Sequence, residues 1–120
     1  MLDRLVVRGI PAFGRHGVLE SERRSGQRFV VDLVLGIDAV AAAAADDLSA
    51  TVDYAEVAAA VRADVESQPV SLLETLAARL AELCLQRPLV HWAEVTVHKP
   101  EAPMGVSVTD VAVTVTRGRS

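Results

Sequence analysis

Hydrophobic and polar residues change their spacing several times along the chain, and the first part has the spacing of two strands. Residues 2–10 alternate in part, which predicts a strand that ends near Gly9 to Pro11. Residues 14–26 are polar and contain three glycines, which predicts a loop. The β-branched run over residues 27–37 predicts a second strand, which forms an antiparallel hairpin with the first.

The middle of the chain has helical spacing instead. Apolar residues recur every three or four positions from Asp53 until Gln68-Pro69 breaks the pattern, and a second helix follows Ser71 and ends at Pro88. An alanine run over residues 39–45 predicts one or two further helical turns. The residues expected to face the core are Tyr54, Val57, Ala58, Val61 and Val65 in the first helix, and Leu72, Leu73, Leu76, Leu80 and Leu83 in the second.

Two more alternating stretches, residues 90–99 and 110–116, complete an order of ββααββ. This order predicts a single α+β domain over residues 1–120, with a four-stranded antiparallel sheet and two helices on one face. The second strand is apolar on both of its faces, so the uncovered face and the free edges of the sheet need cover. We therefore expect a homo-oligomer whose sites straddle subunits.

Composition narrows the classes of function. A net charge of −4 and the absence of a Lys/Arg cluster argue against nucleic-acid binding. The chain start lacks the apolar region of a signal peptide, and no apolar run reaches membrane-spanning length, so we expect no membrane partner. A single cysteine, Cys84, fits a reducing, cytoplasmic setting, and its leucine neighbours indicate a small core residue rather than a catalytic thiol.

Four side chains are candidates for chemistry, and each has a structural alternative. Glu74 lies three residues after Ser71, which fits a capping box; alternatively, a carboxylate on a first helical turn stays ionised and can grip an amidine-like edge, such as that of a pterin. Tyr54, the only tyrosine, either packs under its helix or donates a proton. Lys99 closes a strand, where a lysine usually guards a solvated edge. Glu22 taken alone is one more charged loop residue.

A metal or nucleotide site is not expected. His16, His91 and His98 share no metal-ligand spacing, and no glycine-rich phosphate loop follows a strand.

Taken together, several segments resemble those of the dihydroneopterin aldolase family, in the family's order and spacing and over nearly the whole chain. The matching segments are Gly14-Arg15-His16-Gly17-Val18, Glu22-Arg23-x-x-Gly26-Gln27-x-Phe29-x-Val31-Asp32, Asp46-Asp47-Leu48-x-x-Thr51-Val52-Asp53-Tyr54, Leu72-Leu73-Glu74-Thr75 and Val97-His98-Lys99-Pro100-x-Ala102-Pro103.

The resemblance implies a T-fold subunit, in which four sheets join into a β-barrel with the helices outside, as a tetramer or as an octamer of two stacked rings. It implies an active site between subunits that binds a small pterin substrate. Glu74 then anchors the 2-amino and N3–H edge of the pterin, the backbone N–H of Leu73 meets the ring carbonyl, and Val52 of the neighbouring subunit gives the ring backbone contacts.

The implied reaction is a retro-aldol cleavage of 7,8-dihydroneopterin in folate biosynthesis, with possible epimerisation at C2′ to dihydromonapterin. Lys99 is the catalytic lysine, Tyr54 of the neighbour handles the proton of the intermediate, and Glu22 lies near the hydroxylated side chain of the substrate. The N5=C6 imine of the substrate accepts the electrons, so neither a metal nor an organic cofactor is expected.

Two alternatives stay open at this point. A dihydroneopterin triphosphate epimerase on the same scaffold needs extra basic groups, for which Arg15, Arg23 and Arg24 are available. A non-catalytic pterin-binding oligomer needs Glu74 but has no use for Lys99 or Tyr54.

Overall fold

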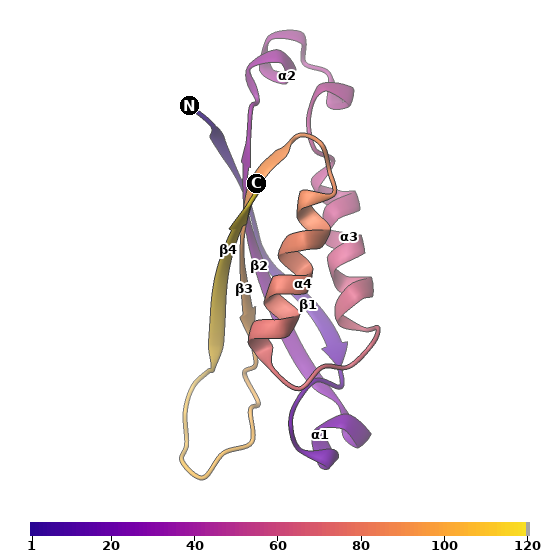
Figure 1. Ribbon diagram of the computed structural model, residues 1–120, viewed down its shortest axis with the longest axis vertical. Coiled ribbons are helices and arrows are strands. Elements are labelled where there is room, and N and C mark those ends of the chain that lie inside the picture. Colours follow the sequence, from indigo (N-terminus) through magenta and orange to yellow (C-terminus); the bar gives the residue numbers. More distant parts are fainter. Residues whose placement is uncertain (120) are drawn as a thin grey trace.

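The computed structural model describes residues 1–119, which form one antiparallel sheet with two helices packed on one of its faces (Figure 1). The order of the main elements confirms the predicted ββααββ arrangement, and the strands lie in the sheet in chain order. In sequence, the elements are β1 (Asp3–Gly14), α1 (Glu20–Ser25), β2 (Gln27–Ile37), α2 (Val40–Ala45), the 3-10 helix η1 (Leu48–Ala50), α3 (Tyr54–Val65), α4 (Leu73–Leu85), β3 (Val90–His98) and β4 (Ala112–Gly118).

The first strand is longer than its sequence suggested. β1 continues to Gly14, so the predicted end near Gly9 to Pro11 is wrong. The strand bulges at Gly9, which takes a φ of 77° and donates its N–H to Asp32 Oδ1 at 2.8 Å. Pro11 is tolerated because β1 is an edge strand, where one row of N–H groups has no partner strand. The predicted loop over residues 14–26 is also only partly right, because it contains the short helix α1.

The two long helices begin differently. α3 has a side-chain N-cap: Asp53 accepts hydrogen bonds from the N–H groups of Ala55 and Glu56 at 3.1 and 3.3 Å. α4 begins one residue later than predicted, with Leu72 in the N-cap position and no side-chain cap. The proposed capping role of Ser71 is therefore wrong.

The core lies between α3, α4 and the covered face of the sheet. β2 has the alternation of a half-covered strand, with every second side chain in the core. Tyr54 and Leu72 do not join the core, since they are 60% and 50% exposed, and this corrects their predicted inward orientation. The fully buried side chains include Phe29, Val31, Leu33 and Leu35 of β2, Val61 and Val65 of α3, Leu76, Leu80 and Cys84 of α4, and Val95 and Val97 of β3.

The face of the sheet away from the helices is more polar than the sequence of β2 indicated. On it, the two ring nitrogens of His98 contact the carboxylates of Asp32 and Asp110, each at 2.7 Å. The hydroxyls of Thr96 and Thr114 share a hydrogen bond of 2.7 Å between neighbouring strands. The uncovered face of the sheet is therefore a weaker reason to expect an oligomer than the sheet edges. β1 and β4 each have one side without a partner strand within residues 1–119.

The molecule is elongated, with extents of 52 × 26 × 22 Å. α1, the start of α4 and the connection between β3 and β4 gather at one end, which is the lower end in Figure 1. α2 and the start of α3 lie at the opposite, upper end. No helix within residues 1–119 is long and apolar enough to cross a membrane.

Candidate active site

Lys99 and Glu22 form an ion pair at the lower end of the sheet. Lys99 directly follows β3 and lies on the same side as Val95 and Val97, which face the helices, because side chains alternate along a strand. Its ammonium contacts Oε2 of Glu22 on α1, and the two side chains keep only 12% and 5% of their exposure. Lys99 is therefore not a solvated edge lysine, and Glu22 is not an ordinary loop carboxylate.

Glu22 is held by more than the lysine. Gln27 Nε2 donates to Oε2 of Glu22 at 2.9 Å, and the Leu19 N–H donates to Oε1 at 3.3 Å. Burial by itself raises the pKa of the Glu22 carboxyl, but the hydrogen bonds from Lys99, Gln27 and Leu19 outweigh burial, and the net pKa lies below its ordinary value. The carboxylate therefore stays ionised at neutral pH. Gly17 makes room for it, since a Cβ there would lie 2.3 Å from Glu22 Oε1.

Gln27 lies beside Glu22, and the sequence assigned it no role. Its Oε1 atom is buried and has no hydrogen-bond partner within residues 1–119, while its Nε2 is committed to Glu22. The only sequence signal was its place in the matching segment Gly26-Gln27. Glu22 and Gln27 also line an open cavity of about 570 Å³, together with Phe13, Ser21, Ser25, Gly26, Arg28, Glu101 and Pro103. The ion pair thus borders space that a small molecule can enter.

The head of α4 lies at the same end of the molecule. Glu74 is exposed in the first turn, and no hydrogen bond to its side chain occurs within residues 1–119. The hydroxyl of Ser71 accepts from Arg23 Nη2 at 2.7 Å instead of capping the helix. The N–H of Leu73 likewise has no acceptor in this part of the chain. A carboxylate and a backbone donor are therefore both available to a ligand at a helix N-terminus.

Val52 and Tyr54 lie at the start of α3, at the end of that helix away from the head of α4. Tyr54 begins that helix and is exposed, whereas Val52 is buried and lines a small cavity of about 180 Å³ with Asp53, Glu56, Arg87 and other residues. α3 is 12 residues long, which corresponds to roughly 18 Å. One chain therefore brings together Glu22, Leu73, Glu74 and Lys99, but not Val52 or Tyr54.

Two of the three arginines that a triphosphate would need are committed to the local fold. Arg15 donates to the backbone carbonyls of Arg23 and Arg24. Arg23 donates to Gly17 O and to Ser71, and Arg24 pairs with Glu20 on its own helix. The contacts of Arg15 and Arg23 weigh against the epimerase alternative, because these two guanidinium groups already bind other parts of the chain, whereas the pair of Arg24 with Glu20 is exposed.

The cysteine and the histidines do not form a second site. Cys84 is buried, and burial raises the pKa of its thiol to about 11, which confirms it as a core residue. No group of three or more His, Cys, Asp or Glu side chains arranged to hold a metal occurs within residues 1–119.

Comparison with known proteins decides the family. The family model described as dihydroneopterin aldolase matches residues 5–116. A curated dihydroneopterin aldolase from Streptomyces coelicolor is 52% identical over 118 residues, which cover 98% of this chain and 99% of that protein. The chain belongs to the dihydroneopterin aldolase family.

Solved structures of the family superpose closely on this chain. A putative dihydroneopterin aldolase from Vibrio cholerae gives a TM-score of 0.90 at 30% identity, with 99% of each chain covered. The Escherichia coli dihydroneopterin aldolase, solved in complex with neopterin, gives 0.89 at 29% identity, with 97% and 99% covered. The protein therefore has the T-fold of this family and is a carbon–carbon lyase of folate biosynthesis.

Proposed function

We propose that 7,8-dihydroneopterin is cleaved at a site shared by two copies of the chain. In this proposal Glu22, Leu73, Glu74 and Lys99 come from one protomer, and the remaining residues, Val52 and Tyr54, come from its neighbour. The observation that carries the proposal is the nearly buried ion pair of Lys99 with Glu22, of which Glu22 lines an open cavity. The neopterin complex of the Escherichia coli relative supports a pterin as the ligand class.

Glu74 and Leu73 hold the pterin ring. The carboxylate accepts two hydrogen bonds, from the 2-amino group and from N3–H, and the Leu73 N–H donates to the ring carbonyl. The exposure of Glu74 supports this role, because its carboxylate is not engaged by its own helix. The N-terminal end of the helix dipole favours the ionised carboxylate. On the other side of the ring, the backbone around Val52 of the neighbour completes the pocket.

Lys99 and Glu22 handle the proton that starts the reaction. Lys99 first gives one proton of its ammonium to Glu22, which passes it on to solvent. The neutral amine then accepts the proton of the substrate's 2′-hydroxyl through a water as the C1′–C2′ bond breaks. Glu22 also faces the hydroxylated side chain of the substrate. Gln27 Oε1 is a buried acceptor beside this pair, suited to a substrate hydroxyl or to that water.

The electrons released at C1′ move into the N5=C6 imine and leave an enamine, so the proposed step needs neither a metal nor a protein Schiff base. Tyr54 of the neighbour, or a water held by it, then protonates C1′ of the enamine. The products are 6-hydroxymethyl-7,8-dihydropterin and glycolaldehyde. If the fragments recombine before release, the C2′ epimer dihydromonapterin results.

Two features support a homo-oligomer. β1 and β4 each present an edge that another copy can pair with, in a ring of tetramer or octamer size. The two groups of site residues lie at opposite ends of α3, so that one chain cannot unite them. A cytoplasmic location is consistent with the single cysteine and the folate pathway.

Subunit complementation tests this shared site. Lys99→Ala and Tyr54→Phe variants are each prepared as purified oligomers, mixed in equal amounts, dissociated and reassembled. Each variant alone should be weakly active, whereas random mixing should restore about a quarter of the sites, because one interface then combines an intact Lys99 with an intact Tyr54. Activity that remains at the level of the separate variants after exchange would contradict a site shared between protomers. Exchange itself is monitored by native mass spectrometry of a tagged subunit.

A further inference from the structure

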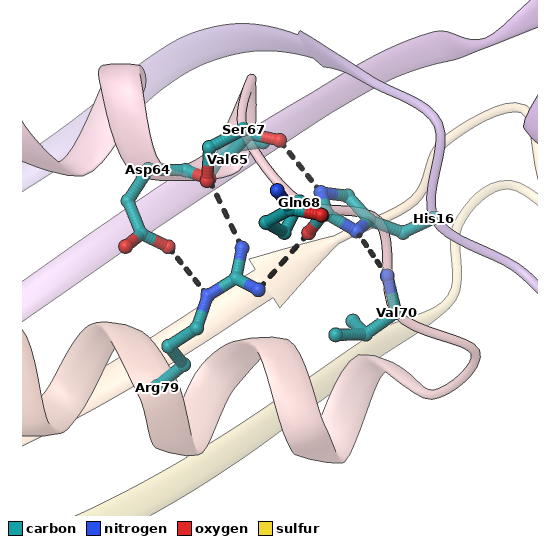
Figure 2. Close-up of polar contacts among 7 residues, drawn as sticks. All are labelled: His16, Asp64, Val65, Ser67, Gln68, Val70 and Arg79. Carbon is teal, nitrogen blue, oxygen red and sulfur yellow. Dashed lines mark hydrogen bonds and ion pairs between the residues drawn. The ribbon is translucent and has the colours of Figure 1, made fainter.

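Two loops at the lower end of the molecule are bonded to one another. One precedes α1 and contains His16 and Gly17; the other, residues 66–72, leads into α4. The Gly17 N–H donates to Val70 O at 2.9 Å, and the Val70 N–H donates to His16 Nδ1 at 3.0 Å. His16 Nε2 in turn donates to Val65 O at 2.6 Å, so both nitrogens of the buried ring are used (Figure 2).

The second loop is also fixed from α4 itself. Arg79 donates to the Asp64 carboxylate at 2.7 Å, to Asp64 O at 3.0 Å and to Gln68 O at 3.0 Å (Figure 2). The segment between α3 and α4 is therefore rigidly attached to the helix that follows it. The hydrogen bonds of Val70 with His16 and Gly17 tie this segment to the loop before α1, but they make no connection to α1 itself.

Arg23 makes that connection. It is the residue after Glu22 on α1, and its Nε donates to Gly17 O at 3.1 Å while its Nη2 donates to Ser71 Oγ at 2.7 Å. Both acceptors are uncharged, so these bonds fix geometry and do not balance charge. Ser71 lies two residues before Leu73, the first residue of α4.

We propose that Arg23 is a positioning residue that sets the spacing between the Glu22 carboxylate and the head of α4. The inference rests on the proposed function, in which Glu22 and Lys99 face the substrate side chain and Leu73 and Glu74 hold the ring. The affinity for a substrate that is held at both ends depends on the spacing between the two groups of residues. The affinity for a ligand held only at its ring does not.

The test compares two ligands in matched variants. Arg23→Gln removes the bridge, and Arg24→Gln is the control, since Arg24 lies on the same short helix and pairs only with Glu20, at 70% and 90% side-chain exposure. Dissociation constants are measured by fluorescence for neopterin, which has the hydroxylated side chain, and for unsubstituted pterin, which has only the ring.

We expect Arg23→Gln to weaken neopterin binding about tenfold and to lower kcat/KM for dihydroneopterin by at least as much, because small misplacements of substrate-positioning groups are costly. Pterin binding should stay within about twofold of the wild type, since a single end of the site suffices for it. Ser71→Ala should reproduce the selective loss in part, because it removes one of the two hydrogen bonds that Arg23→Gln removes. For the same reason the double variant should lose no more than Arg23→Gln alone.

Three results would overturn the inference. One is a neopterin affinity in Arg23→Gln equal to that of Arg24→Gln. Another is an equal loss for both ligands, which would indicate general damage to the fold, and thermal unfolding of each variant checks this directly. The third is a wild type that neither binds neopterin nor cleaves dihydroneopterin; only this result would also remove the proposed function.

Discussion

Replacing Glu74 by alanine separates the role of this residue in binding from any role in folding. Its side chain is exposed and makes no hydrogen bond within residues 1–119, so its loss should cost the fold only the interaction with the helix dipole, about 0.3–1 kcal/mol. In the proposed complex the carboxylate accepts two charge-assisted hydrogen bonds. At about 1.5 kcal/mol for each bond, the loss is about 3 kcal/mol, or a dissociation constant for neopterin raised roughly 150-fold.

Fluorescence titration with neopterin measures this change, and thermal unfolding measures the cost to the fold. Glu82→Ala is the matched control, because Glu82 is also exposed on α4 but lies far from its first turn. The control should bind like the wild type. A Glu74→Ala variant that keeps wild-type affinity would show that the ring is held elsewhere and would refute the anchoring role.

Three further predictions concern groups outside the reacting centre. The pKa of His16 is lowered, chiefly by burial, so the neutral ring stabilises the fold fully above the ordinary pKa of 6.5, and this contribution is lost as the pH falls through the pKa of the folded protein. The melting temperature should therefore drop on mild acidification, and it should drop less in His16→Gln. The pKa of His98 is raised, chiefly by its hydrogen bond with Asp110, so the charged ring stabilises the fold fully below pH 6.5, and this contribution is lost as the pH rises through the pKa of the folded protein. Melting temperatures measured over this pH range should fall with rising pH in the wild type, and His98→Gln should remove this dependence. Burial raises the pKa of the Cys84 thiol to about 11, so iodoacetamide should not alkylate it at neutral pH until the protein is unfolded, as measured by mass spectrometry.

The parts of the fold that the sequence predicted well are those decided by local pattern. β2 occupies residues 27–37 as predicted, because a β-branched run of that length has no competing helical period. α3 starts where Asp53 can cap it, and a cap is also a local signal.

The errors arise where distant residues decide the local structure. β1 passes Gly9 because Asp32, on the neighbouring strand, accepts its N–H. Ser71 does not cap α4 because Arg23 takes its hydroxyl. In both cases a tertiary hydrogen bond replaces the one that the local pattern favoured.

The candidate site also combines features that a local pattern predicts with features that depend on distant parts of the chain. Family resemblance supplied the residue types, but no local pattern connects Glu22 with Lys99, because they meet only where the end of β3 reaches α1. Nor does any local pattern reveal that the start of α3, where Tyr54 lies, is at the opposite end of the molecule from the end of β3, which Lys99 follows. That separation depends on the antiparallel arrangement of the two long helices against the sheet.

The central claim is that the Lys99–Glu22 pair drives cleavage of 7,8-dihydroneopterin. The most direct test is the rate at which the wild type and Lys99→Ala release glycolaldehyde from that substrate. The account predicts one glycolaldehyde for each substrate consumed by the wild type, and a rate at least about 100-fold lower for the variant with neopterin binding largely kept. Equal rates for the two proteins, or no glycolaldehyde from the wild type, would contradict it.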